Sequence, residues 1–124
     1  VGDFYAGLFT DSGELAEQLD YAGRDAGEEV YRLPMGKKYD KLIDSSIADM
    51  RNTSTVKGVS PGSTTAAHFL KRFVTDDCKD YAHLDIASVA FDSKCSDAAP
   101  SVGATGFGVK LIDYLCKNNI ENEN

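Results

Sequence analysis

Hydrophobic residues fall in short continuous runs and in stripes at helical spacing, which predicts strands and helices in alternation. A strand-like apolar run covers residues 5–10, and a second run covers 81–87, where Asp85 is the one charged side chain. Apolar side chains recur every three or four residues in the segments 14–26, 39–50, 63–74 and 109–116. With a short extended piece at 30–34, this order predicts an α/β fold in which helices cover a sheet.

Turn-forming and hydroxyl residues mark the ends of the expected helices. Residues 11–13 provide capping chemistry before the first helix, and Gly27 is its expected stop. Ser63 or Thr64 is expected to cap the helix 63–74. The apolar stripe of that helix consists of Ala66, Ala67, Leu70, Phe73 and Val74. This stripe is expected to face the core.

Composition excludes several classes of function. The 124 residues include 13 basic and 20 acidic side chains, with a formal net charge of -7, so we expect no nucleic-acid partner. No apolar run approaches the roughly 20 residues of a membrane helix, and no signal peptide opens the sequence, so we expect no membrane partner. Cys78, Cys95 and Cys116 are too scattered for a disulfide scaffold or a zinc motif. We expect reduced thiols in a cytoplasmic protein.

Candidate catalytic and metal-binding residues are few. His68 and His83 have no Cys, Asp or Glu at a familiar metal spacing, so both are expected to be structural. Asp85 needs hydrogen-bond donors inside an apolar strand, and we expect it to hold nearby loop N–H groups, with catalysis as the less favoured alternative. The segment 23–29 is interpreted as a helix end, not a metal site, and the glycines of 103–108 as tight packing, not a phosphate cradle.

Several motifs together are more specific than any of them alone. The sequence Ser-Thr-Thr-Ala-Ala-His-Phe-Leu-Lys-Arg-Phe-Val at 63–74 is followed by Ala-His-Leu-Asp-Ile-Ala at 82–87. Further stretches fit in order: Tyr-Ala-Gly-Leu-Phe-Thr at 5–10, Arg-Leu-Pro at 32–34, Ile-Ala-Asp-Met at 47–50 and Gly-Ala-Thr-Gly at 103–106. This set resembles the C-terminal part of the catalytic domain of the M17 leucyl aminopeptidases, also called cytosol aminopeptidases. The resemblance implies that residues 1–124 form the C-terminal portion of that domain, an α/β fragment with part of a mixed sheet flanked by helices.

The resemblance implies an enzyme that removes N-terminal residues, often leucine, from peptides. It implies two divalent ions, manganese, zinc or magnesium, in the parent enzyme, which activate a shared water. It also implies a homohexamer. The metal ligands of the family lie upstream of the matched part, so the resemblance places no catalytic residue and no metal ligand in this chain. By itself the chain is then expected to bind no metal ion and to be inactive.

The resemblance also implies residues of the substrate pockets. Matching along 83–90 places the two positions that line the pocket for the N-terminal side chain at Ala87 and Ala90. Some relatives have Met where Ala90 stands, so a wider pocket and a preference for larger side chains are expected here. A looser match through the expected loop 51–61 places Thr53 near the pocket for the following residue. The expected long loop 88–102 suggests contact with a substrate or a neighbouring subunit.

The sequence also allows a second interpretation. The chain could be a stand-alone module, descended from such an enzyme, that binds peptides or subunits without chemistry. Both interpretations agree with the expected lack of metal ligands. The strand-like start of the sequence favours a portion of a larger enzyme.

Overall fold

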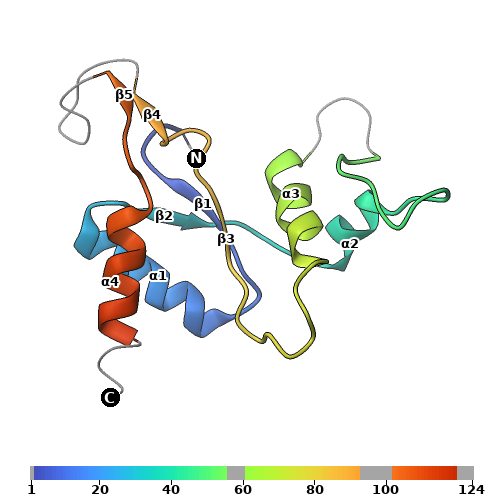
Figure 1. The fold of residues 1–124 in the computed structure, drawn as a ribbon, viewed down its shortest axis with the longest axis horizontal. Helices are drawn as coiled ribbons and strands as arrows, with labels where there is room; N and C mark the ends of the chain where they lie inside the picture. The colour runs from blue at the N-terminus through green and yellow to red at the C-terminus, as the bar shows by residue number, and fades with distance from the viewer. Residues whose placement is uncertain (1, 56–60, 93–101, 120–124) are drawn as a thin grey trace.

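A computed structural model describes residues 2–55, 61–92 and 102–119 (Figure 1). Its elements, in chain order, are β1 (Ala6–Phe9), α1 (Gly13–Ala26), β2 (Val30–Arg32), α2 (Lys37–Asp40), the 3-10 turn η1 (Lys41–Ile43), α3 (Gly62–Lys71), β3 (His83–Asp85), β4 (Phe91–Asp92), β5 (Gly103–Ala104) and α4 (Val109–Asn119). Strands and helices interleave along the chain, which confirms the predicted α/β class.

Strand β1 is the centre of a three-stranded mixed sheet. It pairs in parallel with β2 and antiparallel with β3, and Gly7 lies opposite both Tyr31 and Asp85. All four residues of β1 are buried. Strands β4 and β5 form a separate antiparallel pair, in which Phe91 lies opposite Ala104.

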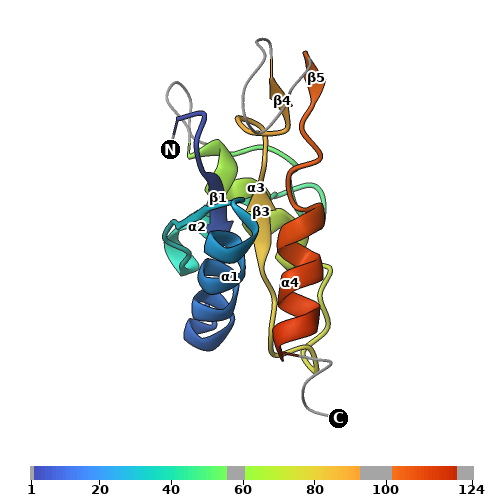
Figure 2. The same cartoon turned by 90° about the vertical axis from the view of Figure 1, so that its left-hand side faces the viewer.

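Helices cover the three-stranded sheet on both sides. Helices α1 and α4 lie side by side against β1 and β3 (Figure 2), whereas α3 and α2 lie on the other side of these strands (Figure 1). Side chains alternate between the two faces of a strand, so Ala6 and Leu8 share the face toward α1 and α4. The cluster of buried apolar residues on that face comprises Ala6, Leu8, Ala16, Leu19, Val30, Val89 and Leu111.

The end of α1 and the start of α4 are joined through Glu28. Gly27 adopts a left-handed conformation with φ 69°, and the N–H of Glu28 donates to the carbonyl of Gly23 at 2.8 Å. The carboxylate of Glu28 then accepts hydrogen bonds from the N–H groups of Gly108 (2.9 Å) and Leu111 (3.0 Å). The segment 23–29 is therefore a helix end, as predicted. An internal carboxylate thus occupies the position at the start of α4 where helix N–H groups favour an anion.

The predicted helix over 39–50 is wrong beyond Ile43. Helix α2 ends at Asp40, η1 continues to Ile43, and residues 44–50 form no helix; Ile47 is 94% exposed. The hydroxyl of Ser45 accepts hydrogen bonds from the N–H groups of Ile47 (3.3 Å) and Ala48 (3.1 Å). Such local side-chain acceptors compete with helical backbone bonds, which explains why the apolar spacing was misleading.

Helix α3 begins one residue earlier than predicted, and Ala67 is the one residue of the predicted apolar stripe that is buried. Its N-cap is Pro61, so neither Ser63 nor Thr64 caps it, and the hydroxyl of Thr65 donates to backbone carbonyls of the first turn. The buried residues are Thr64, Thr65, Ala67 and His68. Leu70 is 46% and Phe73 66% exposed. Polar side chains line the buried face because Thr65 and His68 find hydrogen-bond partners there.

The remaining differences are small. Strand β3 is shorter than the predicted strand 81–87, and the expected loop 88–102 contains a turn and β4, with β5 directly after it. Residues 93–101 of that loop lie outside the described part of the chain, as does Cys95. Cys78 and Cys116 are free thiols. None of the helices within residues 2–55, 61–92 and 102–119 combines the length and apolar character needed to cross a bilayer.

Replacing Glu28 is expected to destabilise the start of α4. Glu28→Ala removes two charge-assisted hydrogen bonds and leaves the N–H groups of Gly108 and Leu111 unpaired, at an expected cost of about 1–3 kcal/mol in local stability. Faster amide hydrogen exchange throughout α4 is the expected result. Glu29→Ala is the control, because only the backbone carbonyl of Glu29 takes part in a hydrogen bond. Equal exchange rates in the two variants would contradict the capping role.

Replacing either of two glycines of α1 by alanine is expected to change stability, and the two replacements are expected to differ in direction. A Cβ at Gly23 would lie 2.7 Å from the carbonyl oxygen of Glu28, so Gly23→Ala is expected to lower the free energy of unfolding by about 1–3 kcal/mol. A Cβ at Gly13 has no neighbour within 4 Å, so Gly13→Ala is expected to be neutral or stabilising by about 0.4–1 kcal/mol. Urea unfolding followed by circular dichroism measures both, and equal midpoints would refute the close approach at Gly23.

Candidate functional site

The residues predicted to line the N-terminal side-chain pocket lie on one turn after β3. The N–H groups of Val89 and Ala90 both donate to the carbonyl of Ile86, at 3.0 and 2.9 Å, which closes a single helical turn. Residues three apart on such a turn lie on the same face, so Ala87 and Ala90 share one face. Val89 is only 8% exposed and anchors the turn in the core, whereas Ala87 is exposed and Ala90 half-buried.

Asp85 holds the first end of this turn. Its Oδ1 accepts a hydrogen bond from the N–H of Ala87 at 3.1 Å. A hydrogen bond with the Ser63 side chain, and then the Ala87 N–H, lower the pKa of Asp85, and these effects outweigh the opposing effect of burial. Asp85 thus holds loop N–H groups as predicted, and it also links the turn to the first residues of α3.

Thr105 holds the second end of the turn, a role that the sequence did not predict. Its hydroxyl donates to the carbonyl of Val89 at 2.6 Å, and its N–H donates to the carbonyl of Ala90 at 3.0 Å. The same hydroxyl accepts the N–H of Phe107 at 3.2 Å. The only signal in the sequence was the segment 103–106, which gave the resemblance but no role for its threonine.

The structure does not bring Thr53 next to Ala87 and Ala90. Thr53 is exposed and belongs to the segment 44–55, which lies beyond α3 from the end of β3 (Figure 1). Since the match assigns Thr53 to a different pocket, the separation does not bear on Ala87 and Ala90.

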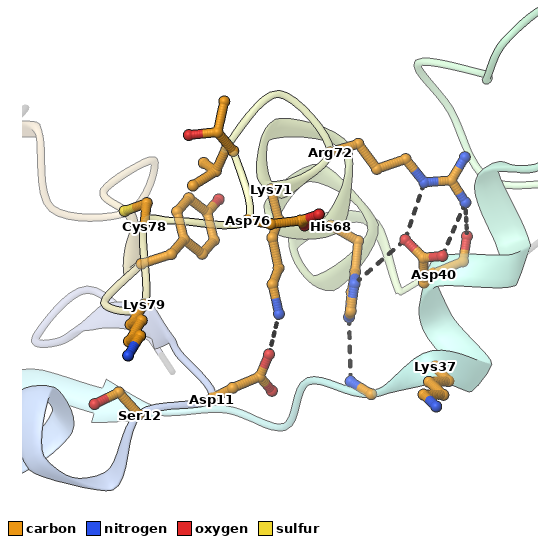
Figure 3. A pocket seen from close by; sticks show the side chains of 14 residues that line it. Asp11, Ser12, Lys37, Asp40, His68, Lys71, Arg72, Asp76, Cys78 and Lys79 are labelled. Atoms are coloured by element: carbon orange, nitrogen blue, oxygen red, sulfur yellow. Dashed lines mark hydrogen bonds and ion pairs between the residues drawn. The ribbon is translucent and has the colours of Figure 1, made fainter.

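A charged cavity of about 630 Å³ lies elsewhere, between α2, the end of α3 and the start of α1 (Figure 3). Asp11, which follows β1, lies at this cavity, whereas the turn 86–90 lies beyond the opposite end of β1, where Gly7 pairs with Asp85. The cavity is therefore distinct from the predicted pocket wall.

Several charged side chains that line this cavity form ion pairs with one another. Arg72 donates two hydrogen bonds of 3.0 Å to the carboxylate of Asp40 and one of 2.7 Å to Asp44. These bonds raise the pKa of Arg72 and lower that of Asp40. Lys71 pairs with Asp11 (Figure 3). The pairs connect α3 to α2 and to the start of α1, so their evident role is to hold these elements together.

Both histidines have the structural environments that the sequence predicted. His68 is 5% exposed, and its Nε2 accepts the N–H of Gly36 at 3.1 Å. Burial lowers the pKa of His68 more than the nearby Asp40 carboxylate raises it. Burial likewise lowers the pKa of His83, whose ring lies 5.9 Å from that of Phe9. Both imidazoles thus lie in fixed contacts within the fold.

The described residues do not provide a metal centre. Within 2–55, 61–92 and 102–119, no three His, Cys, Asp or Glu side chains come together in a way that could hold an ion. What these residues do provide is a well-anchored turn with two small side chains on one face. Chemically, such a turn can shape a pocket and contact an apolar side chain.

Comparison with known proteins identifies the family of this chain. Residues 1–112 match the model of the catalytic domain of the cytosol aminopeptidase family, which is a family of peptidases. A probable cytosol aminopeptidase of Rhizobium etli is 50% identical over 98% of this chain, and those of Phytoplasma mali and Rickettsia bellii are 49% and 46% identical over the same share. The chain therefore belongs to the cytosol aminopeptidase family, peptidase family M17.

The match covers only part of each relative. The aligned residues make up 23% of the Rhizobium etli protein and 24% of the Rickettsia bellii protein. The chain thus spans about a quarter of the length of the curated relatives it matches.

The two histidines, His68 buried and His83 half-buried, predict a pH dependence of stability. In the unfolded chain, His68 binds a proton near pH 6.5, whereas burial opposes that proton in the folded state. The free energy of unfolding is therefore expected to fall as the pH drops below about 6.5, by at most about 1.4 kcal/mol per pH unit for one proton. The pKa values of Asp40 and Asp85 are lowered from 3.8, so these carboxylates do not contribute to the change.

Urea unfolding between pH 7 and pH 5 measures this slope. His68→Gln, which keeps an acceptor for the N–H of Gly36, is expected to reduce the slope, and the part that remains is assigned to His83. A slope unchanged in His68→Gln, or a His68 pKa above 6.5 in an NMR titration, would contradict this assignment.

Proposed function

We propose that residues 1–124 are the C-terminal portion of the catalytic domain of a leucyl aminopeptidase that removes N-terminal residues from peptides by two-metal hydrolysis. In this proposal the chain supplies a wall of the substrate pocket and packing for the domain. Membership of the cytosol aminopeptidase family supports the reaction class. The observation that carries the pocket role is that Ala87 and Ala90 share one face of a turn anchored by Val89.

The described residues do not fit a two-metal centre, because no group of three or more candidate ligands comes together among them. We therefore assign the ligands of the manganese, zinc or magnesium ions to the part of the longer enzyme that this chain does not include. We assign no catalytic residue and no metal ligand to this chain, and we expect the chain alone to be inactive.

Within the proposed pocket, the chain acts by shape. The methyl groups of Ala87 and Ala90 contact the side chain of the substrate's N-terminal residue, and the short Ala90 side chain leaves room for a large one. One methylene more or less in such a pocket changes selectivity by roughly 10–200-fold. Thr53 is proposed to lie near the following residue of the peptide, in the second pocket.

Assembly and location are proposed from the same family. The curated relatives carry the name cytosol aminopeptidase, so we propose a cytoplasmic enzyme that acts on peptides. Exposed apolar side chains on and just beyond α3, Leu70 and Phe73, support further contacts with the rest of the enzyme or with other subunits. A homohexamer is the proposed assembly.

A larger side chain at position 90 is expected to weaken the preference for large N-terminal residues. In the full-length enzyme, Ala90→Met is expected to lower the ratio of kcat/KM for phenylalanine anilide to that for leucine anilide by about ten-fold, because the longer side chain fills the end of the pocket. Steady-state kinetics with added manganese measure both substrates. Ala66→Met, on the exposed side of α3, is the matched control and is expected to leave the ratio unchanged.

Three outcomes would contradict the proposal. A full-length protein without metal-dependent turnover would refute the enzyme assignment. Peptide binding without turnover would instead favour the stand-alone binding module. An unchanged ratio in Ala90→Met would refute the pocket position of Ala90.

A further inference from the structure

The turn that carries Ala87 and Ala90 is held at both ends by side chains outside its exposed face. Asp85 precedes the turn on β3, and Thr105 follows β5, distant in sequence. We propose that Asp85 and Thr105 are positioning residues, which set the preference for the substrate's N-terminal side chain by fixing the place of this turn. This inference rests on the proposed function of the turn as a pocket wall.

The Thr105 end is fixed by one residue with three hydrogen bonds. The Thr105 hydroxyl donates to the carbonyl of Val89 (2.6 Å) and accepts the N–H of Phe107 (3.2 Å), while its own N–H donates to the carbonyl of Ala90 (3.0 Å). Both backbone carbonyls at the end of the turn are thereby tied to one residue. Without the hydroxyl, the carbonyl of Val89 and the N–H of Phe107 both lose this partner.

The Asp85 end is fixed through the backbone of Ala87. The carboxylate accepts the Ala87 N–H at 3.1 Å and is also hydrogen-bonded to the Ser63 side chain. The turn is therefore tied to α3 on one side and to the segment after β5 on the other. The three bonds that reach the turn end on its backbone N–H and carbonyl groups, so the methyl groups of Ala87 and Ala90 stay available to a substrate.

A displaced turn affects substrates unequally. A leucine or phenylalanine side chain reaches a wall of this kind, whereas an alanine side chain is too short to depend on it. Loosening the turn is therefore expected to weaken binding of large N-terminal residues, which raises KM, and to leave alanine substrates nearly unchanged. A residue that only stabilises the fold would lower activity toward all three substrates alike.

The test compares Thr105→Val with Thr105→Ser in the full-length enzyme, using leucine, phenylalanine and alanine anilides. Thr105→Val removes the hydroxyl at nearly constant volume and is expected to lower kcat/KM about ten-fold for leucine and phenylalanine, mainly through KM. For alanine we expect a change below about two-fold. Thr105→Ser keeps the hydroxyl and is expected to keep the substrate preference of the unaltered enzyme.

Thr10 provides a matched control. Its buried hydroxyl also donates to a backbone carbonyl, that of Tyr81 (2.7 Å), and accepts an N–H two residues later, that of Ser12 (3.1 Å). It lies at the opposite end of the β1–β3 pair from the turn. Thr10→Val loses the same kind of bonds, so it is expected to lower stability without changing the preference among the three substrates.

Several results would overturn the inference. One is an equal loss for all three substrates in Thr105→Val, and another is a shift of preference in Thr10→Val as large as that in Thr105→Val. If Thr105→Val does not fold, Asp85→Ala and Asp85→Asn test the other end. Asn keeps an oxygen for the Ala87 N–H, so a changed preference in Asp85→Ala and not in Asp85→Asn supports the inference, and equal preferences in both overturn it.

The Ala90→Met variant separates this inference from the proposed function. If Ala90→Met changes the preference and Thr105→Val does not, the turn is a pocket wall and only the positioning role fails. If Ala90→Met leaves the preference unchanged, the pocket wall and the positioning role both fail.

Discussion

The complete burial of β1 is the constraint on which the rest of this structure depends. A buried strand has to pair its backbone on both edges, and β1 does so with β2 on one side and β3 on the other. Pairing with β3 fixes Asp85 opposite Gly7, and the turn 86–90 leaves the sheet from that point. The position of the proposed pocket wall is thus set by the register of the central strand.

A second constraint comes from polar groups that close the ends of elements. The Glu28 carboxylate joins α1 to α4, the Arg72 guanidinium joins α3 to α2, and Thr105 joins β5 to the turn. Each bond satisfies backbone groups that a helix end or a loop leaves unpaired. Apolar burial holds α1 and α4 against the sheet, and these hydrogen bonds fix the paths of the segments between the elements.

The sequence predicted the α/β class, the end of α1 at Gly27 and the structural role of the histidines, because periodicity and helix-end chemistry are local properties. The mixed sheet was expected from the family resemblance. The prediction from sequence failed at 44–50, where Ser45 competes for backbone N–H groups, and on α3, where partners distant in sequence make the buried face polar. The role of Thr105 could not be predicted, since its partners Val89 and Ala90 are known only once β4 and β5 pair. Placing Ala87 and Ala90 in a pocket required the family resemblance.

The backbone anchoring of the turn has a consequence for how the family can diversify. Asp85 and Thr105 hold residues 86–90 through main-chain N–H and carbonyl groups, and the turn adds the buried Val89 side chain and the Ser88 hydroxyl, which donates to the Tyr5 carbonyl. None of these contacts uses the methyl group of Ala87 or Ala90. The residues at 87 and 90 are therefore free to vary in size without loosening the scaffold beneath them. In the proposed substrate pocket, selection can then act on pocket dimensions separately from the integrity of the domain, so the proposal makes substrate range an evolvable trait.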